Sequence, residues 1–281
     1  MPLNDAAATS VSAPAKRLSY AGGEAGLQRA LPVEAPVGII YSPKPYAVMM
    51  ATPADLEDFA FGFSLTEGVI SDAADIREVR VTSHPDGHRV EISLVAEKLK
   101  MQMARTRNLA GRTGCGVCGI EDIEALPFAA KRVRGGDALK LSSVRNAVQA
   151  LDTHLPLGDL TRATHAAAWC SAEGDIVCVR EDVGRHNALD KLIGALLRAK
   201  ANAASGFVLV TSRCSFEMVE KAAAFGASAI VAISAPTSLA LERALLHSMT
   251  LVAVARRDGA LLFSSGPGFN NDLLIKGAQS A

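Results

Sequence analysis

The 281-residue sequence predicts an α/β protein, α+β overall, in which a smaller α+β part precedes a layered α/β part. Within residues 33–108, two hairpin patterns flank one amphipathic helix. Beyond residue 165, strands alternate with helices of about ten residues, which is typical of parallel strands joined by crossover helices. We therefore expect an N-terminal α+β subdomain over 33–108 and an α/β domain over 109–281.

Local signals place the first elements. Residues 1–32 are rich in Ala, Ser and Gly, and we expect a flexible tail there. Two apolar runs, 37–41 and 46–50, lie on either side of a proline turn and predict a hairpin. Thr52 then precedes a proline and an apolar stripe, so we expect a helix that Thr52 caps and Gly68 ends.

The later elements follow from the same periodicities. Residues 76–81 and 90–94 alternate in polarity around a Pro-Asp-Gly turn, which predicts a second hairpin. A serine at 142 or 143 opens a helix that reaches about Leu155. The remaining expected strands are 165–170, 176–180, 207–211, 230–234 and 250–255, and the expected helices are 187–200, 216–225 and 239–246.

Composition limits the classes of partner. Lys plus Arg and Asp plus Glu both number 29, so no net charge attracts nucleic acid or an anionic membrane. The apolar runs are too short to span a bilayer. Five cysteines, an odd number spread along the chain, do not suggest a disulfide framework. We therefore expect a cytoplasmic protein with neither nucleic-acid nor membrane partners.

The segment Gly114-Cys-Gly-Val-Cys-Gly119 places Cys115 and Cys118 between glycines. Glycine allows positive φ and close approach by another molecule, and Cys-x-x-Cys spacing lowers the pKa of a thiol. Arg112 adds a nearby positive charge. This pattern indicates reactive sulfur more than packing.

Four chemistries compete for this pair. Structural zinc would need a second pair of ligands at zinc spacing, which is missing, so we expect no structural metal. Zinc deamination would need a Pro before the first cysteine and an upstream His-x-Glu, but Gly114 stands at the first position and only His84 has an acidic residue two positions on. Thiol-disulfide exchange stays open, although the mobile glycine flanks suit a sulfur carrier better, because the sulfur must visit two partners.

Three loops between a strand and a helix, 181–187, 211–215 and 234–238, carry polar or cationic side chains. In a parallel sheet such loops meet at the carboxyl ends of the strands, where helix N-termini attract anions. The fork of donors on Arg213 suits a phosphate. His186 could hold a phosphate or purine edge, or it could cap the following helix.

Five motifs in this order resemble the FdhD family of formate dehydrogenase accessory sulfurtransferases. They are GRTGCGVCG (111–119), THAAAW (164–169), EDVGRHNALDKLIG (181–194), SFEMVEKAA (215–223) and SAPTSLA (234–240). The resemblance implies a cytidine-deaminase-like fold, a homodimer, and a persulfide relay from a cysteine desulfurase to the bis-molybdopterin guanine dinucleotide molybdenum cofactor of formate dehydrogenase. The alternatives are a chaperone that binds this cofactor without sulfur transfer, and a thiol-disulfide oxidoreductase.

By position, the resemblance makes Cys115 the persulfide cysteine and Cys118 its partner. It also places the cofactor-binding segment after the last long strand, at Val254, Ala255, Arg256, Arg257, Asp258 and Gly259. The family often has Gly-Arg in this turn, whereas this chain has Arg256-Arg257-Asp258-Gly259. We interpret Cys170, Cys178 and Cys214 as packing residues, because the first two lie on apolar strands and Cys214 stands where a small side chain is expected.

Overall fold

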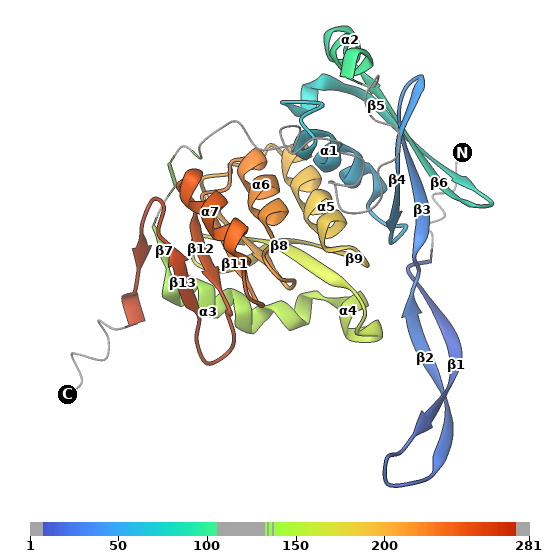
Figure 1. The fold of residues 1–281 in the computed structure, drawn as a ribbon, viewed down its shortest axis with the longest axis vertical. Coiled ribbons are helices and arrows are strands. Elements are labelled where there is room, and N and C mark those ends of the chain that lie inside the picture. The colour runs from blue at the N-terminus through green and yellow to red at the C-terminus, as the bar shows by residue number, and fades with distance from the viewer. Residues whose placement is uncertain (1–7, 106–132, 134, 137, 274–281) are drawn as a thin grey trace.

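The computed structural model describes residues 8–105, 133, 135–136 and 138–273 of the chain. A six-stranded sheet and a four-stranded sheet form the body, and a two-stranded hairpin extends away from it (Figure 1). The mixed α/β class expected from the sequence is confirmed. The expected boundary at residue 108 lies outside the described residues, and the cytidine-deaminase-like layering stays a prediction.

The six-stranded sheet has the strand order β13-β12-β11-β10-β8-β9. Its strands are β8 (His165–Ser171), β9 (Ile176–Asp182), β10 (Gly206–Val210), β11 (Ala229–Ala232), β12 (Thr250–Ala253) and β13 (Leu261–Ser264). The pairs β10–β11 and β11–β12 are parallel, as expected, while β8 pairs antiparallel with both β9 and β10. The edge strand β13 was not expected from the sequence.

Helices cover both faces of this sheet (Figure 1). One face carries α5 (Arg185–Arg198), α6 (Phe216–Phe225) and α7 (Ser238–Leu246), and the other carries α3 (Leu141–Ala150). The buried Val144 and Val148 of α3 belong to the same apolar cluster as Phe207 and Leu209 of β10. A 3-10 turn (Leu151–His154) and α4 (Pro156–Thr161) follow α3, and the short strands β7 (Leu139–Lys140) and β14 (Phe269–Asn270) pair in parallel.

The four-stranded sheet, of order β4-β3-β6-β5, contains both hairpins that the sequence predicts. Its elements are β3 (Ala35–Tyr41), β4 (Lys44–Ala51), α1 (Leu56–Thr66), the 3-10 turn Ala73–Asp75, β5 (Ile76–His84), β6 (Gly87–Leu94) and α2 (Ala96–Arg105).

The predicted cap of α1 is wrong. The helix begins at Leu56, and its N-cap is Asp55 in the left-handed conformation, without a side-chain cap. The Thr52 hydroxyl instead accepts a hydrogen bond from the backbone N–H of Val183, at 3.2 Å. The backbone N–H of Thr52 donates to Asp182. Long-range contacts to the β9–α5 loop therefore hold Thr52 outside the helix.

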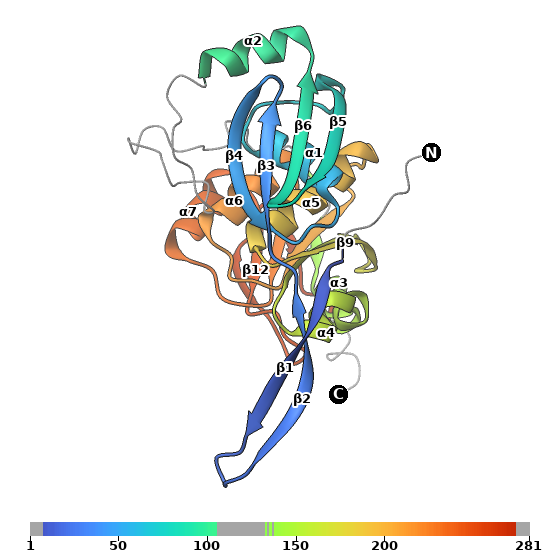
Figure 2. The ribbon, with the colours of Figure 1, turned by 90° about the vertical axis from the view of Figure 1, so that its right-hand side faces the viewer.

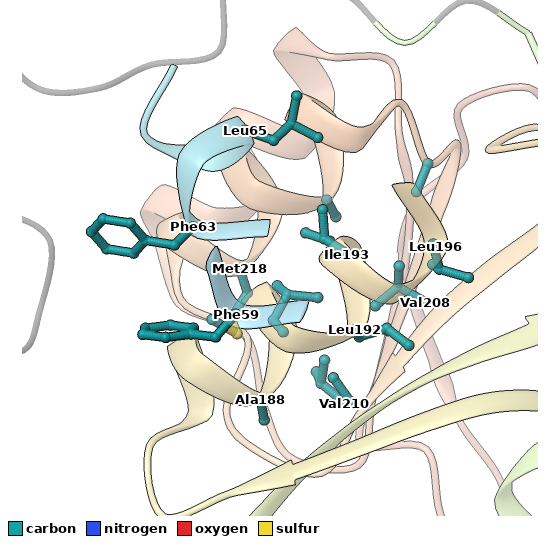
Figure 3. Packing of buried hydrophobic residues seen from close by; sticks show 14 of the residues in the cluster. Phe59, Phe63, Leu65, Ala188, Leu192, Ile193, Leu196, Val208, Val210 and Met218 are labelled. Atoms are coloured by element: carbon teal, nitrogen blue, oxygen red, sulfur yellow. The ribbon is translucent and has the colours of Figure 1, made fainter. Parts of the chain in front are cut away.

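Helix α1 joins the two sheets by packing on α5. Figure 3 shows Phe59, Phe63 and Leu65 of α1 in one apolar cluster with α5, β10 and Met218 of α6. The two helices meet at Gly62 and Gly194. A Cβ added to Gly194 would lie 1.8 Å from the backbone oxygen of Asp58, and one added to Gly62 would lie 1.7 Å from that of Asp190. This approach is possible only without a side chain at either position.

The flexible tail expected over 1–32 is a hairpin in its described part. Strands β1 (Ser10–Leu18) and β2 (Glu24–Pro32) pair antiparallel and project from the body (Figures 1 and 2). Gly22 and Gly23 supply the φ values of 94° and 97° that the turn requires. The glycines that suggested a tail therefore form a hairpin turn. None of the helices in the described part of the chain has the length and apolar character needed to cross a bilayer.

Candidate functional site at the carboxyl edge of the six-stranded sheet

The strand directions bring the predicted anion loops together at one edge of the sheet. Both β9 and β10 run antiparallel to β8, so they point the same way, and β11 and β12 are parallel to β10. The carboxyl ends of these four strands therefore lie at one edge. The loops 181–187, 211–215 and 234–238 and the turn 254–259 all follow those ends.

We call this edge of the sheet the rim. Backbone hydrogen bonds join three of its segments: the loops 211–215 and 234–238 and the turn that begins at Val254. Cys214 N donates to Ala235 O at 3.2 Å, and Thr237 N donates to Cys214 O at 3.0 Å. Val254 N donates to Ser234 O at 3.1 Å. These bonds hold the backbones of the three segments against one another.

Two helices begin at this rim without a side-chain cap. The N-cap of α5 is Gly184, which has no side chain, and the N-cap of α6 is Ser215, whose hydroxyl donates to Glu217 at 3.1 Å. By contrast, the Thr237 side chain caps α7 by accepting from Ala240 N at 3.2 Å. The first N–H groups of a helix lack intrahelical acceptors and form the positive end of its dipole. The starts of α5 and α6 are thus suited to an anion.

His186 links these two helices. Its Nε2 lies 3.0 Å from Glu217 Oε2, and the residue is only 9% exposed. The sequence left two roles open for His186, ligand binding or capping of the following helix. The imidazole does not cap the helix, because it forms a hydrogen bond with a carboxylate on α6. Binding of a ligand by His186 stays a prediction, and its contact with Glu217 would orient the ring for that role.

Glu217 was not singled out from the sequence. Burial by itself raises the pKa of this carboxyl, but the hydrogen bonds from His186 and Ser215 and the charge of Arg185 together lower the pKa. Glu217 is therefore a carboxylate at neutral pH, which makes it the acceptor for both neighbours. No local sequence signal could have found this pair, because the partners are 31 residues apart on different helices.

Arg185 and His165 complete this end of the rim. Arg185 is the first residue of α5, and its Nε is buried without a hydrogen-bond partner. His165 begins β8 and pairs with Asp182 of β9. Partial burial lowers the pKa of His165, and the charges of Arg185 and His186 lower it further, against an opposing effect from Asp182. The charge of Arg185 contributes to the lowered pKa of both His165 and Glu217.

The segment expected to bind the cofactor, residues 254–259, is buried in its first part and exposed in its second. Ala255 is fully buried against the α3 side of the sheet, and Val254 has a positive φ of 51°. Beyond them Arg256 N donates to Gly259 O at 2.7 Å, which closes an exposed turn. Residues 256–259 are therefore the exposed part of this segment, and Val254 is partly exposed.

Arginines at the rim differ in their contacts. Arg213 is exposed on the loop between β10 and α6, where the sequence analysis placed it. Arg257 donates to Asp152 at 2.9 Å in a solvent-exposed ion pair, so its charge is partly offset. Asp258 is also exposed in the same turn. Ligand binding by these residues stays a prediction.

Cys115 and Cys118 lie outside the described residues. After them the described chain resumes at Val133, whose N–H donates to His247 O at 3.2 Å. His247 is the C-cap of α7, which joins the parallel strands β11 and β12, so Val133 lies at the amino edge of the sheet. The described end of the cysteine segment is therefore opposite the rim.

The other three cysteines are packing residues, which confirms their interpretation from the sequence. Cys170 and Cys214 are fully buried, and burial raises the pKa of each thiol to about 12. Cys178 is partly buried against the core, and burial raises its pKa as well. Among the described residues, no three His, Cys, Asp or Glu side chains are grouped so that they could hold a metal ion.

We expect Cys170 and Cys214 to resist alkylation at pH 8, because a thiol of pKa about 12 is thiolate only in a fraction of about one in ten thousand at that pH. Iodoacetamide treatment of the native protein, followed by peptide mass analysis, measures this. The same two cysteines should react fully in 8 M urea, roughly the concentration that unfolds small proteins. Labelling of native Cys214 at the rate seen in urea would contradict the assignment.

Comparison with known proteins agrees with this architecture. The FdhD/NarQ family model matches residues 32–267. A sulfur carrier protein FdhD from Xanthomonas euvesicatoria pv. vesicatoria is 46% identical over 243 residues, 86% of each chain. One from Cupriavidus necator is 45% identical over 231 residues, 82% of this chain and 80% of the relative.

A solved structure has the same fold. A crystal structure from Desulfotalea psychrophila, assigned to a formate dehydrogenase accessory protein, superposes with a TM-score of 0.70 at 26% identity. The superposition covers 92% of this chain and 98% of that one. With most of its length matched by the family model and by relatives of this similarity, the chain belongs to the FdhD/NarQ family.

Proposed function

We propose that the protein is a sulfurtransferase that carries sulfur as a persulfide. Cys115 accepts the sulfur from a cysteine desulfurase, Cys118 assists it, and the acceptor is the bis-molybdopterin guanine dinucleotide cofactor that formate dehydrogenase requires. The observation that carries the proposal is the burial of the other cysteines. Cys170 and Cys214 are fully buried and partial burial raises the pKa of Cys178, which leaves the glycine-flanked pair as the best candidates for reactive sulfur. The relatives named as sulfur carrier proteins support the same role.

The loading step needs no external oxidant or reductant. The Cys115 thiolate attacks the outer sulfur of the donor persulfide, a new S–S bond forms, and the donor's S–S bond breaks. The donor cysteine leaves as a thiolate and takes up a proton from solvent. The glycines around Cys115 suit this step, because they allow the close approach of a protein donor.

The rim at the carboxyl edge is the proposed site for the cofactor. Its nucleotide parts carry phosphates, and the rim offers the uncapped starts of α5 and α6 as well as Arg213, Arg256 and Arg257. His186 would contact the same ligand from its fixed position beside Glu217. We also propose that the protein acts in the cytoplasm as a homodimer, which analytical ultracentrifugation would test.

The test of the carrier role is intact-mass analysis after incubation with a cysteine desulfurase and cysteine. We expect a gain of about 32 Da, one sulfur atom, that maps to the peptide containing Cys115. Cys115→Ala should lose this gain and should fail to restore formate dehydrogenase activity in cells that lack the protein. The matched control is Cys178→Ala, which changes a partly buried thiol outside the cysteine segment. This variant should keep both the mass gain and the ability to restore formate dehydrogenase activity.

Two outcomes would contradict the proposal. If Cys115→Ala restores formate dehydrogenase activity fully, the protein acts as a cofactor-binding chaperone without sulfur transfer. If the reduced protein turns over a model disulfide catalytically and never gains sulfur, it is a thiol-disulfide oxidoreductase.

A further inference from the structure

We propose that the hairpin β1–β2 is a docking surface for an acidic protein partner, the enzyme that takes the cofactor from the rim. The inference rests on the proposed function, because it assigns formate dehydrogenase to a particular surface of this chain. The hairpin lies almost wholly outside residues 32–267, the part of the chain that the family model matches. Membership of the family therefore does not by itself explain why the hairpin is present.

The two faces of the hairpin carry different side chains. In its antiparallel register, Val11 pairs with Leu31 and Ala15 pairs with Leu27. Paired residues point to the same side of a sheet, and neighbours along a strand point to opposite sides, so these four side chains share one face. We call it the apolar face. Val11, Leu27 and Leu31 are 51%, 41% and 45% exposed, so three large aliphatic side chains lie uncovered on it.

The opposite face satisfies its own polar groups. Ser12 Oγ donates to Gln28 at 3.1 Å, and Lys16 Nζ donates to Glu24 at 3.0 Å, in both cases from one strand to the other. Leu18, beside the turn, is the one large aliphatic side chain of this face. A two-stranded hairpin by itself is only marginally stable in water, because it has no core on either side. A partner that covers the apolar face would therefore stabilise the hairpin.

The charge of the apolar face favours an acidic partner. By the same register, Arg17 and Arg29 lie on this face, which carries no acidic residue. Arg29 donates to the backbone oxygen of Thr161 at 3.4 Å, and neither arginine forms an ion pair with a described residue. A surface with carboxylates around an apolar patch is complementary to this arrangement. A second copy of this chain would bring two arginine-bearing faces together, which disfavours self-association through them.

The hairpin is anchored beside the rim. The carboxylate of Glu181, at the carboxyl end of β9, accepts hydrogen bonds from the N–H groups of Leu157 and Gly158 in α4, at 2.9 and 2.6 Å. Helix α4 in turn contacts β2, and Arg29 reaches Thr161, the last residue of α4. Figure 2 shows the hairpin projecting from the body next to α4. A protein that receives the cofactor at the rim would therefore also meet the hairpin.

The edge of β1 is less suited to a partner than its face. The strand carries Pro14, which has no backbone N–H, and the charged residues Lys16 and Arg17. Proline and charged side chains are usual protections of an exposed strand against pairing with another strand. We therefore expect the partner on the apolar face, where side chains and not backbone groups determine recognition.

The test is a binding titration of the purified full-length protein with cofactor-free formate dehydrogenase, followed by biolayer interferometry. We expect the double variant Leu27→Ser with Leu31→Ser to weaken binding by about 10- to 100-fold, since it removes two aliphatic side chains from the centre of the interface. The matched control is Leu245→Ser, which changes an exposed leucine near the end of α7. This variant should bind as the wild type does.

A second pair of variants tests the charge of the face. Arg17→Gln should weaken binding by about three- to tenfold at low salt and by much less at about 0.5 M salt, where exposed charges are screened. Lys16→Gln removes a charge from the neighbouring position on the opposite face and should keep the wild-type affinity. Equal losses for the two variants would show that the apolar face does not select the partner.

Other results would overturn the inference. These variants change exposed side chains, so their melting temperatures should equal that of the wild type, and wild-type affinity in the double leucine variant would then count against docking. Absence of binding by the wild type at about 0.1 mM, a weak interaction for a protein pair, would do the same. If the double variant lost self-association or desulfurase binding and kept dehydrogenase binding, another partner would cover this face.

Failure of this inference and failure of the proposed function can be told apart. Persulfide loading on Cys115 does not involve the hairpin, so the double leucine variant should still gain about 32 Da from the desulfurase. Conversely, Cys115→Ala should bind formate dehydrogenase with wild-type affinity. Loss of sulfur loading in the wild type, with binding that still depends on Leu27 and Leu31, would refute only the carrier role.

Discussion

Lys191→Met is expected to lower the free energy of unfolding by about 3–5 kcal/mol, the usual cost of leaving one member of a buried ion pair without its partner. Lys191 Nζ lies 2.6 Å from Asp182 Oδ2, and neither side chain is exposed. Lys191 also donates to Thr52 O at 2.8 Å. The pair thus connects α5, the end of β9 and the segment before α1. Methionine fills a similar volume but leaves the Asp182 charge buried without a cation.

Urea denaturation followed by circular dichroism measures this change. The double variant Lys191→Met with Asp182→Asn should recover part of the loss, because the amide carries no charge to leave unpaired. Arg80→Gln breaks an exposed pair with Glu78, whose side chains are 62% and 58% exposed, and should change stability by less than about 1 kcal/mol. If Lys191→Met and Arg80→Gln shift the urea midpoint equally, the buried pair does not stabilise the fold as we argue.

Gly194→Ala is expected to destabilise the protein by about 3 kcal/mol, at the upper end of the usual range for overpacking. The new methyl would lie 1.8 Å from Asp58 O, a backbone atom of α1 that cannot rotate away. Alanine otherwise favours a helix over glycine by about 1 kcal/mol, so any loss must come from forcing α1 and α5 apart. Since α1 connects the two sheets, the whole body should melt earlier.

Thermal unfolding tests this prediction, and a loss of that size lowers the melting temperature by roughly 6–12 °C in a domain of this size. Gly26→Ala is the matched control, because a Cβ there meets nothing within 4 Å. An unchanged melting temperature for Gly194→Ala would mean that the two helices are not in the close contact described.

Some elements could be predicted from the sequence because their signals are local. The hairpin β3–β4 follows from two apolar runs around a proline turn, and β5–β6 follows from alternating polarity around a Pro-Asp-Gly turn. The helix α6, Phe216–Phe225, coincides with the predicted helix. The strand β13 was missed because its three apolar residues, Leu261, Leu262 and Phe263, are all exposed and show no alternation in polarity. The hairpin β1–β2 was missed because its strands are mostly exposed, so burial leaves little periodic pattern in the sequence.

Some features of the candidate site could likewise be predicted from the sequence and others could not. The three anion loops were expected at one edge, because the order of strands and helices places loops that follow parallel strands together. The contact between His186 and Glu217 could not be predicted, because it joins two helices whose relative position depends on their packing. The predicted start of α1 was wrong because long-range contacts decide it. Hydrogen bonds between Thr52 and a loop more than 100 residues away outweigh its local capping signal.

The sequence by itself determined the class of fold, the family and the identity of the two glycine-flanked cysteines as candidate carriers, because each depends on residue type and short-range spacing. Only the tertiary structure decided that Cys170 and Cys214 are fully buried, that α1 and α5 touch through glycine, and that His186 contacts Glu217. Burial, backbone approach and contacts between side chains all depend on distances between residues far apart in the chain. Such distances are set when the sheets and helices pack.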